Sequence, residues 1–564
     1  MSQSLRRNLI VIAAYLLLTL VFTYPLITQF STHVIGGGKL DNYEYIWKMW
    51  WIPHALTNGI NPFFISTINY PSGYYLAYGE ITPIHTFLLI PLTLVFGEVV
   101  TYNLAVIGST ILTGWITFLL ARRWFARLID EPDDRLLTLA AFFAGAAFAF
   151  CVSRQEKLTG HLPLFDTEWM VLALLAFDLW LETRKPRHAA LTALALSLGA
   201  LSSWYFAFIL ALLLPVYLIA YGVNWRQFLT DRRSWQALAL VVVIVGVTNV
   251  PFLIPYLQLN TQGATFVPIQ DASFWAASPT DYLIPNPLNP IWGSVMSKII
   301  WPFPSPMITE FVISLGLVTL LLGLYGSRRT KGKHWRALKW MIVVAFVLSL
   351  GPYLYLSRLP LNIPLLDLLL RRILPSADSI RSWGRFSMVV MLGFSLLASA
   401  GLLVALHSAE RPSVRRYRNA IAALVIAMML FEAWIGPVHT VPVEPRPVDL
   451  WLAQQPDNAP IMEFPLSAAL SGPGMYYTRF HGKPVTYGYG TYLPLLYTQQ
   501  HPALLTFPSD ASLDQLKTWG VHYVLVTTDT LQYEKFKMRD VDAQPRLQHV
   551  ITLDDVEVYR LKDS

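Results

Sequence analysis

The sequence predicts an α-helical polytopic membrane protein, and its composition and apolar runs carry that prediction. Of the 564 residues, 54% are hydrophobic and 14% are charged, whereas soluble domains are about 25% charged. The mean hydropathy is +0.45. A soluble chain would not hide that much apolar surface, and disordered or fibrous chains have other compositions. The single cysteine, Cys151, excludes an intrachain disulfide and a cysteine metal cluster.

Eleven runs of about 17 or more mostly apolar residues have the length of a membrane helix. They are 8–28, 101–121, 136–153, 165–182, 188–204, 205–222, 235–257, 307–326, 338–357, 384–407 and 418–437. The first run follows Arg6 and Arg7 and has no small-residue cleavage site after it, so we predict an uncleaved anchor. Two further apolar stretches, 82–98 and 361–374, are shorter or broken by proline.

The distribution of Lys and Arg predicts the orientation. With a cytoplasmic N-terminus, and with 82–98 as a re-entrant or interfacial helix, most Lys and Arg between the spans lie inside. The expected location is therefore the plasma (inner) membrane, crossed many times, with an extracytoplasmic C-terminus. The net charge of +7 then reflects cytoplasmic loops, and we expect no nucleic-acid partner.

We expect two domains, a membrane domain over 1–437 and a small α/β extracytoplasmic domain over 438–564. The outer loops of the first would be 29–100, 154–164, 258–306 and 358–383. In the second, "APIMEFP", "VHYVLVT" and "LDDVEVYRL" predict strands, and "SLDQLKTWG" predicts a helix closed by Gly520. No catalytic motif is evident in that second domain.

The first outer loop places Asp41 directly after a glycine-rich stretch and before an aromatic helix. Trp47, Trp50 and Trp51 of that helix predict a belt at the membrane interface. Asp41 is predicted to cap the helix. A carboxylate at a helix start beside the membrane is also well placed to act as a base.

The second outer loop concentrates charge in 15 residues. The charged and titratable residues in this stretch are Arg154, Glu156, Lys157, His161, Asp166 and Glu168. A solvated loop accounts for Arg154 and Lys157. For Asp166 and Glu168 two readings stay open: stabilisation by the helix dipole, or carboxylates facing the same cleft as Asp41 and sharing a proton or a divalent cation with it.

Arginines precede the span 384–407 on the outer side, against the positive-inside trend. Arg381, Arg385 and the nearby Arg372 suit either bidentate phosphate contact or contact with lipid headgroups. Glu310, at the start of another span, is either a cap or a further outer-face carboxylate. Five prolines between residues 268 and 290 predict an ordered, irregular cover over a cavity.

Taken together, these features resemble the GT-C superfamily of polytopic glycosyltransferases. The resemblance rests on the layout of residues 1–260: one span, a long outer loop with Asp41 near its start, and a second acidic outer loop. It looks still closer to bacterial and archaeal GT-C-like proteins with "D-x-x-x-x-x-W…WW…NPF…YP-x-G", "GH…W" and "R-x-x-G-R-F". Here these motifs are Asp41 through Gly73, Gly160/His161/Trp169 and Arg381/Gly384/Arg385/Phe386. The second loop has no D-x-D, and the W-W-D-Y-G motif of oligosaccharyltransferases is absent.

The resemblance implies transfer of a sugar from a polyprenyl-phosphate-linked donor to a glycan, lipid or protein acceptor on the outer face, usually with inversion. Asp41 would be the base, and Arg381 and Arg385, with Arg372, would bind the donor phosphate. Asp166, Glu168 and His161 would assist, with Glu156 and Glu310 as further outer-face polar groups. A divalent cation (Mg or Mn) on Asp41 and Asp166 is left open.

Two other classes of function remain. A polysaccharide or lipid transporter or flippase would usually carry charges at mid-membrane, and the spans have almost none. A non-catalytic assembly protein could use the same scaffold, since a fold does not establish an activity.

Overall fold

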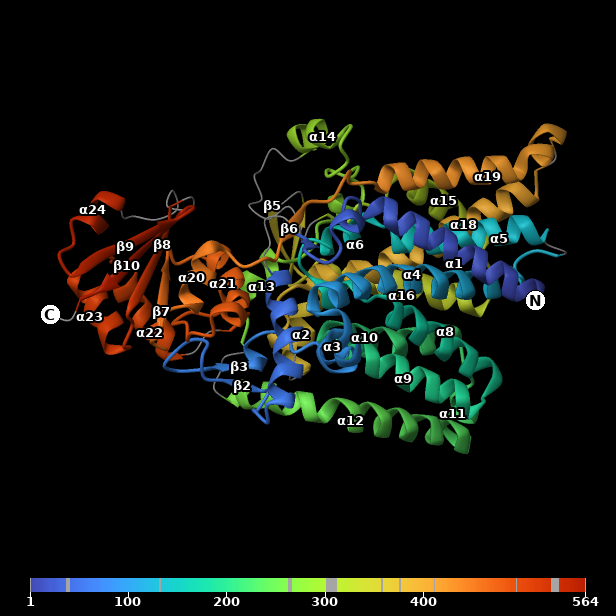
Figure 1. Cartoon of the computed structure of the whole chain (residues 1–564). Helices are drawn as coiled ribbons and strands as arrows, with labels where there is room; N and C mark the ends of the chain where they lie inside the picture. The colour runs from blue at the N-terminus through green and yellow to red at the C-terminus, as the bar shows by residue number, and fades with distance from the viewer. Residues whose placement is uncertain are drawn as a thin grey trace.

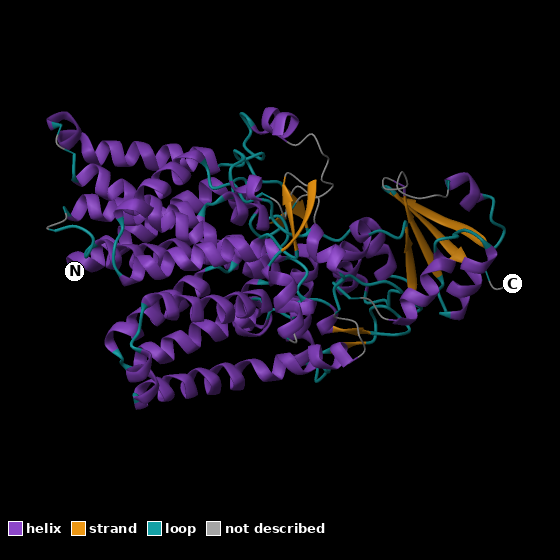
Figure 2. Cartoon of the chain, turned by 180° about the vertical axis from the view of Figure 1, so that it is seen from behind, coloured by secondary structure: helices purple, strands orange, loops and turns teal. Residues whose placement is uncertain are grey.

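The computed structural model describes residues 2–36, 41–130, 133–261, 266–300, 312–356, 359–374, 377–409, 411–492, 495–528 and 537–562. Long helices form a bundle that carries the N-terminus at its far end, and a sheet flanked by short helices forms the other end of the molecule (Figure 1). Nearly all of the strands lie outside the bundle (Figure 2).

The bundle consists of long apolar helices, and each of the eleven expected spans overlaps one of them. They are α1 (Gln3–Phe22), α4 (Glu98–Phe125), α5 (Asp134–Ala149), α8 (Glu168–Thr183), α9 (Pro186–Ser202), α10 (Trp204–Tyr221), α12 (Arg232–Thr261), α15 (Leu317–Arg329), α16 (Lys333–Ser349), α18 (Ser387–His407) and α19 (Pro412–Ala433).

Six helices in the described part of the chain are long and apolar enough to cross a bilayer. They are 3–22, 98–125, 134–157, 204–221, 232–259 and 383–407. These helices confirm the expectation of a mostly helical polytopic membrane protein, whereas the count of eleven crossings stays a prediction. Helix α12 runs along the edge of the bundle with exposed side chains such as Val243 and Val247 (Figure 1), as expected of a lipid-facing helix.

The first outer loop folds into short elements above the bundle. They are β1 (His33–Ile35), α2 (Asp41–Thr57), β2 (Phe64–Ile65), β3 (Tyr74–Tyr75), two turns at Leu76–Tyr78 and Ile84–Leu88, and α3 (Ile90–Phe96). Helix α3 has seven residues, which rise about 10 Å and cannot cross a hydrocarbon core of about 30 Å.

The other outer segments are also short. They comprise α6 (Val152–Lys157), α7 (Leu162–Phe165), α13 (Ile269–Phe274), a turn at Pro279–Tyr282, α14 (Gly293–Ile300), β4 (Tyr353–Leu356), β5 (Leu359–Pro364) and α17 (Leu366–Ile373). The proline-rich segment is accordingly irregular. Glu310 lies outside the described residues.

The C-terminal part contains a four-stranded sheet with the order β7-β8-β10-β9. Strand β7 (Ile461–Phe464) runs parallel to β8 (Tyr523–Thr527), and β10 (Val556–Leu561) pairs antiparallel with β8 and β9 (Leu547–Leu553). The accompanying helices are α20 (Pro447–Ala453), α21 (Ala468–His481), α22 (Leu495–Leu504), α23 (Asp510–Thr518) and α24 (Met538–Asp542). Strands β7, β8 and β10 lie where the sequence patterns predicted strands.

The C-terminal part packs directly on the first outer loop. Strand β6 (Thr440–Pro442) pairs antiparallel with β1, and one buried apolar core joins residues of α2 to residues of β7 and β8. Trp47 and Trp51 are 1% and 8% exposed, and the Trp47 indole donates a hydrogen bond to Thr478 Oγ1 at 3.3 Å. The expected interfacial belt is therefore wrong for these two tryptophans, because α21 covers the face of α2 that would have met lipid.

Candidate functional site

Asp41 is the first residue of α2, and two side chains from distant segments meet its carboxylate. Asp41 Oδ2 lies 3.2 Å from His161 Nε2, and the Tyr489 hydroxyl donates a hydrogen bond to Asp41 Oδ1. Burial and the negative charge of Asp41 raise the pKa of Tyr489, so the phenol keeps its proton and acts as a donor. The first outer loop, the second outer loop and the C-terminal part thus each supply one residue.

Beneath Asp41, a buried ion pair fixes the backbone of residues 79–81. Lys48 Nζ pairs with the Glu44 carboxylate and donates to the Glu80 carbonyl at 2.8 Å. The Tyr256 hydroxyl donates to the Gly79 carbonyl at 3.0 Å and accepts from the Ile81 amide at 2.8 Å. These contacts hold Glu80 in one position, because its backbone is bound from two sides.

The Glu80 carboxylate lies within electrostatic range of both Asp41 and Arg385. Burial raises the pKa of Glu80, the Arg385 charge opposes that rise most strongly, and the Asp41 charge adds to it. Ser203 Oγ donates to Glu80 Oε1 at 3.2 Å. The Arg385 side chain is 8% exposed, and its Cζ lies 4.1 Å from the centre of the Tyr205 ring. A buried arginine and a half-buried carboxylate therefore act on each other electrostatically, within range of the Asp41 charge.

A small cavity of about 10 Å³ lies beside Glu80, which is room for about one water molecule. It is lined by Glu80, Ile81, Thr82, Pro83, Ala200, Leu201, Ser202, Ser203, Trp204, Phe252 and Tyr256. Its polar groups are a carboxylate and hydroxyls, and an indole and apolar side chains form the remaining walls.

Asp166 is buried with partners of its own. Its Oδ2 lies 2.9 Å from His85 Nε2 and accepts from Ser202 Oγ at 2.7 Å. Asp166 and Asp41 both act electrostatically on the Tyr102 hydroxyl of α4. The Asp41 and Asp166 carboxylates thus both act on Tyr102. The direct partners of Asp166, however, are His85 and Ser202.

Glu168 and Arg154 belong to the packing below Asp166. Glu168 Oε2 accepts from Ser109 Oγ at 2.7 Å and from Thr113 Oγ1 at 3.2 Å. Arg154 is fully buried and donates through Nη2 to the Phe165 carbonyl at 2.8 Å. Arg154 therefore closes the loop that carries His161.

The remaining charged residues of the two loops take different places. Glu156 and Lys157 form a buried ion pair with 2.8 Å between Oε2 and Nζ, so the expectation of a solvated second loop is wrong: this loop packs between the bundle and the outer elements. Arg381 Cζ lies 5.2 Å from the centre of the Trp275 ring, and its charge also acts on Tyr489. Arg372 is exposed on α17 and is not among the residues that meet Arg385.

Sequence reasoning missed Glu80, Tyr489 and His85. Glu80 stands alone in "YGEITP", and Tyr489 lies in "TYGYGTY", far along the chain. A single carboxylate just before an apolar stretch was the available signal for Glu80. No local pattern marks Tyr489, because its role depends on α2 meeting the C-terminal part.

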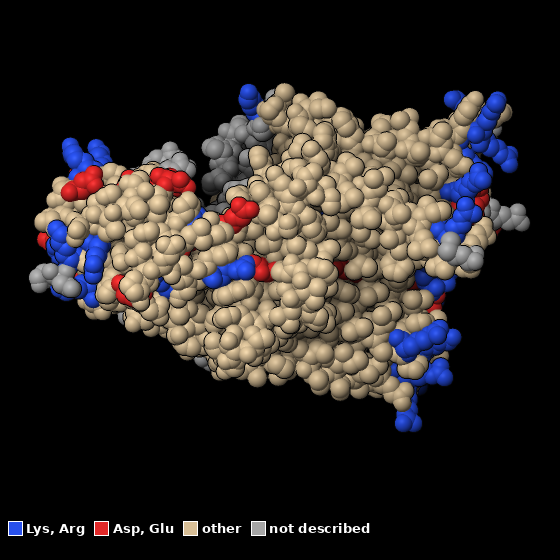
Figure 3. Space-filling model, viewed as in Figure 1, with Lys and Arg blue, Asp and Glu red and all other residues tan. Residues whose placement is uncertain are grey.

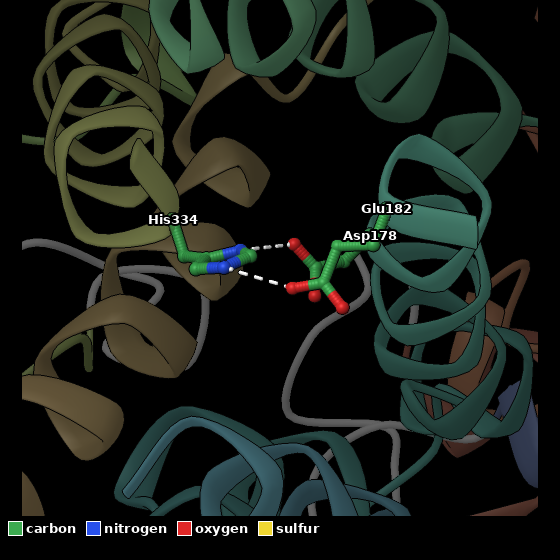
Figure 4. Close-up of side chains that lie close together, drawn as sticks. All are labelled: Asp178, Glu182 and His334. Atoms are coloured by element: carbon green, nitrogen blue, oxygen red, sulfur yellow. Dashed lines mark hydrogen bonds and ion pairs between the residues drawn. The ribbon is translucent and has the colours of Figure 1, made fainter. Parts of the chain in front are cut away.

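A second group of titratable residues lies deeper in the bundle. His334 of α16 points between Asp178 and Glu182 of α8 (Figure 4), with His334 Nε2 3.0 Å from Glu182 Oε1. Asp178 follows Glu168 by ten residues of helix, a rise of about 15 Å away from the site. In the described part of the chain, these three residues form the group of His, Cys, Asp or Glu side chains close enough together to hold a metal ion. Their ligand atoms lie within 4.8 Å of one another.

The carboxylates of this second group already have protein partners. Arg123 and Arg127 both pair with Glu182, and Asp178 accepts from Tyr217 at 2.7 Å and from the Trp124 indole at 3.1 Å. Exposed Lys and Arg side chains gather at the bundle end that carries the N-terminus (Figure 3). Asp178, Glu182 and His334 are therefore part of an ion-pair network that joins α4, α8 and α16.

No family model matches the chain, and no curated protein matches it. The solved structure of arabinofuranosyltransferase AftD from Mycobacteria is similar with a TM-score of 0.62 and 17% identity, covering 100% of this chain and 40% of that one. The chain thus spans well under half the length of that relative.

Two other solved structures are similar over nearly the whole chain. The Archaeoglobus fulgidus oligosaccharyltransferase has a TM-score of 0.53 and 13% identity, covering 93% of this chain and 70% of that one; a further structure of that protein, with a TM-score of 0.53, is a complex with Zn and sulfate. ArnT from Cupriavidus metallidurans has a TM-score of 0.52 and 14% identity, covering 98% and 97%. The fold of this chain is therefore GT-C-like, as the sequence resemblance implied.

Proposed function

We propose that this chain is a membrane glycosyltransferase that moves a sugar from a polyprenyl-phosphate-linked donor to an acceptor hydroxyl outside the cytoplasm, with inversion. The observation that carries the proposal is the grouping of Asp41, His161 and Tyr489 next to Glu80 and Arg385. The names of the similar proteins, which transfer arabinofuranose or an oligosaccharide, agree with it.

Asp41 is the proposed base. The acceptor oxygen attacks the anomeric carbon, the bond from that carbon to the phosphate oxygen breaks, and the leaving phosphate keeps the electron pair. The acceptor proton passes to Asp41, which a hydrogen bond from Tyr489 and contact with His161 hold in place. Positioned general bases contribute about 10² to 10⁴ in rate.

Arg385 and Arg381 are the proposed phosphate ligands. A guanidinium binds phosphate through two parallel hydrogen bonds, and positive charge stabilises the phosphate as it leaves. Glu80 would orient Arg385, because its carboxylate interacts electrostatically with that arginine and accepts a hydrogen bond from Ser203, while Lys48 binds its backbone carbonyl. Asp166 and Glu168 would support the loop that carries His161, through their contacts with Ser202 and Ser109.

A divalent cation would be held by Asp41 and His161. The Asp41 oxygen and the His161 nitrogen lie 3.2 Å apart, and this donor pair fits Mn²⁺ better than Mg²⁺, which prefers oxygen ligands. The buried contacts of Asp166 with His85 and Ser202 make it a poorer ligand than His161. When bound, the cation supplies positive charge toward the donor phosphate.

Transfer from synthetic farnesyl-phosphoryl sugars tests the proposal. The full chain in nanodiscs is given donors that carry arabinofuranose, mannose or glucose, and release of farnesyl phosphate is measured with and without Mn²⁺. We expect turnover with at least one donor, and loss of about 10² to 10⁴ of it in Asp41→Asn. Asp540→Asn, an exposed carboxylate of the C-terminal part, is the matched control and should keep full activity.

Other results would contradict the proposal. Binding of farnesyl phosphate without turnover of any donor would indicate a non-catalytic scaffold, and absence of binding would remove the lipid donor altogether. The proposed orientation has its own test: a reporter fused after residue 440 should report the extracytoplasmic side, and a cytoplasmic signal would invert the topology.

A further inference from the structure

An unusual apolar surface lies on the β4–β5 hairpin and on α17, which follow α16 in the chain. Seven leucine and isoleucine side chains there are each at least 41% exposed. They are Leu356, Leu359, Leu361, Ile363, Leu366, Leu369 and Ile373. Exposed leucine and isoleucine side chains gathered in one short segment point to an interaction surface.

Helix α17 exposes its apolar face and buries a carboxylate, which is the reverse of a helix at a water surface. Leu366, Leu369 and Ile373 have the three- and four-residue spacing of one helix face, and that face is exposed. The opposite face carries Asp367, which is 1% exposed. A helix at a water surface buries its apolar face and exposes its carboxylates, so the surroundings of the exposed face of α17 must be apolar.

Helix α17 is held in this orientation by its inner face. The Arg371 guanidinium donates to the backbone carbonyls of Val267 and Asp378. The Val267 amide also donates to the Asp378 carbonyl at 3.0 Å. The exposed apolar face is therefore part of the packed fold, because the charged side of the helix is bound to the segment that leads to Arg381.

The apolar surface lies at the level where the bundle ends. Strand β4 starts at Tyr353, four residues after α16 ends at Ser349. The Leu365 amide donates to the Pro352 carbonyl at 3.0 Å. The start of α17 therefore lies beside the end of α16. In Figure 1, β5 lies between the bundle helices and the C-terminal sheet. Helices that cross a membrane thus flank this segment on one side, and water-facing elements flank it on the other.

We propose that the β4–β5 hairpin and α17 insert into the outer leaflet of the membrane, with their leucine and isoleucine side chains among the acyl chains. Arg372 shares the exposed face of α17 and contacts lipid phosphates at the headgroup level, as arginines at membrane interfaces do. The lipid surface is favoured over a protein partner because the segment follows α16 in the chain and lies where the bundle helices end (Figure 1). The proposal does not depend on sugar transfer.

Fluorescence quenching by brominated lipid tests the insertion. Cys151 is the only cysteine, so a Cys151→Ser background allows single labels through Leu361→Cys or Leu369→Cys, both at side chains that are already exposed. Each variant carries bimane and is placed, one copy per disc, in a phosphatidylcholine–phosphatidylglycerol nanodisc containing lipid brominated near the headgroup end of the acyl chain. We expect about twofold or greater quenching at both positions.

Val550→Cys is the matched control, because Val550 is an exposed apolar residue on the edge strand β9 of the C-terminal sheet. Its label should keep its fluorescence. Unquenched labels at 361 and 369, in variants that elute and melt like the background protein, would overturn the proposal. Labels that stay unquenched in discs with one copy, and change their fluorescence only when two copies share a disc, would also overturn the proposal. That result would assign the surface to contact between copies.

Discussion

The Tyr489 hydroxyl donates a hydrogen bond to the Asp41 carboxylate across 448 residues of sequence. Asp41 starts the first outer helix, whereas Tyr489 lies in the C-terminal part, after α21. The candidate site is therefore completed by a segment that follows every membrane helix. A variant lacking only this hydroxyl separates its contribution from that of the whole C-terminal part.

We expect Tyr489→Phe to lower the turnover of a farnesyl-phosphoryl sugar about 10- to 100-fold, because a hydrogen bond to a charged group is worth about 1.5 to 3 kcal/mol. Steady-state kinetics in nanodiscs measure the change. Tyr417→Phe, at an exposed tyrosine of α19, is the control. Unchanged kcat in Tyr489→Phe would show that Asp41 does not need this partner.

The interaction of Glu80 with Arg385 predicts non-additive kinetics. Arg385→Lys and Glu80→Gln should each reduce kcat/KM for the donor, and the double variant should lose less than the two losses combined, with a coupling of about 0.5 to 3 kcal/mol. A double-mutant cycle on farnesyl phosphate affinity measures the coupling. Additive losses would mean that Glu80 does not orient Arg385.

Asp367 predicts a pH dependence of stability outside the candidate site. Burial raises the pKa of Asp367 to about 7, against the opposing Arg371 charge. Because the folded pKa lies above the unfolded value of about 4, its contribution to stability is complete below pH 4 and is lost as the pH rises through 7. The loss is at most about 4 kcal/mol.

We therefore expect Asp367→Asn to raise Tm at pH 8 and to change it little at pH 4, measured by thermal unfolding in the same nanodiscs. Asp514→Asn, at an exposed aspartate of α23, should show no such pH dependence. An equal effect of Asp367→Asn at both pH values would indicate that the Asp367 carboxyl keeps one protonation state across this range.

The group around His334 predicts a structural effect without a metal. Asp178→Asn removes the fully buried carboxylate that pairs with Arg123 and His334 and leaves them only Glu182, and breaking a buried ion pair costs about 3 to 5 kcal/mol. We expect a lower Tm for Asp178→Asn, with no change in the wild-type Tm on treatment with EDTA. A Tm that falls with EDTA and recovers with Mn²⁺, Zn²⁺ or Mg²⁺ would make the group a metal site instead.

The helices could be predicted from the sequence because apolar length is a local property. Each expected span falls on a helix, and strands β7, β8 and β10 follow from short apolar runs between turn residues. Strand β9 was not predicted, since it is an edge strand with mostly exposed side chains and a weak pattern.

The candidate site could be predicted only in part. Asp41 and Arg385 stand in recognisable local settings, a helix start and an arginine pair before a span. Glu80 and Tyr489 acquire their place through tertiary contacts with Lys48 and Asp41. The burial of Trp47 depends likewise on Thr478, which no periodicity within α2 could reveal.

The pairing of β1 with β6 sets an order for biogenesis. The Tyr43 hydroxyl donates to the Pro442 carbonyl, 399 residues later, and Val34 pairs with Val441. At ribosomal rates of about 5 to 20 residues per second, the first outer segment waits about 20 to 80 s for its partner. During that interval its strand edge and tryptophans have no cover from β6 and α21. The nascent protein is then open to proteolysis or to capture by chaperones, so its maturation is completed only after the last membrane helix has been made.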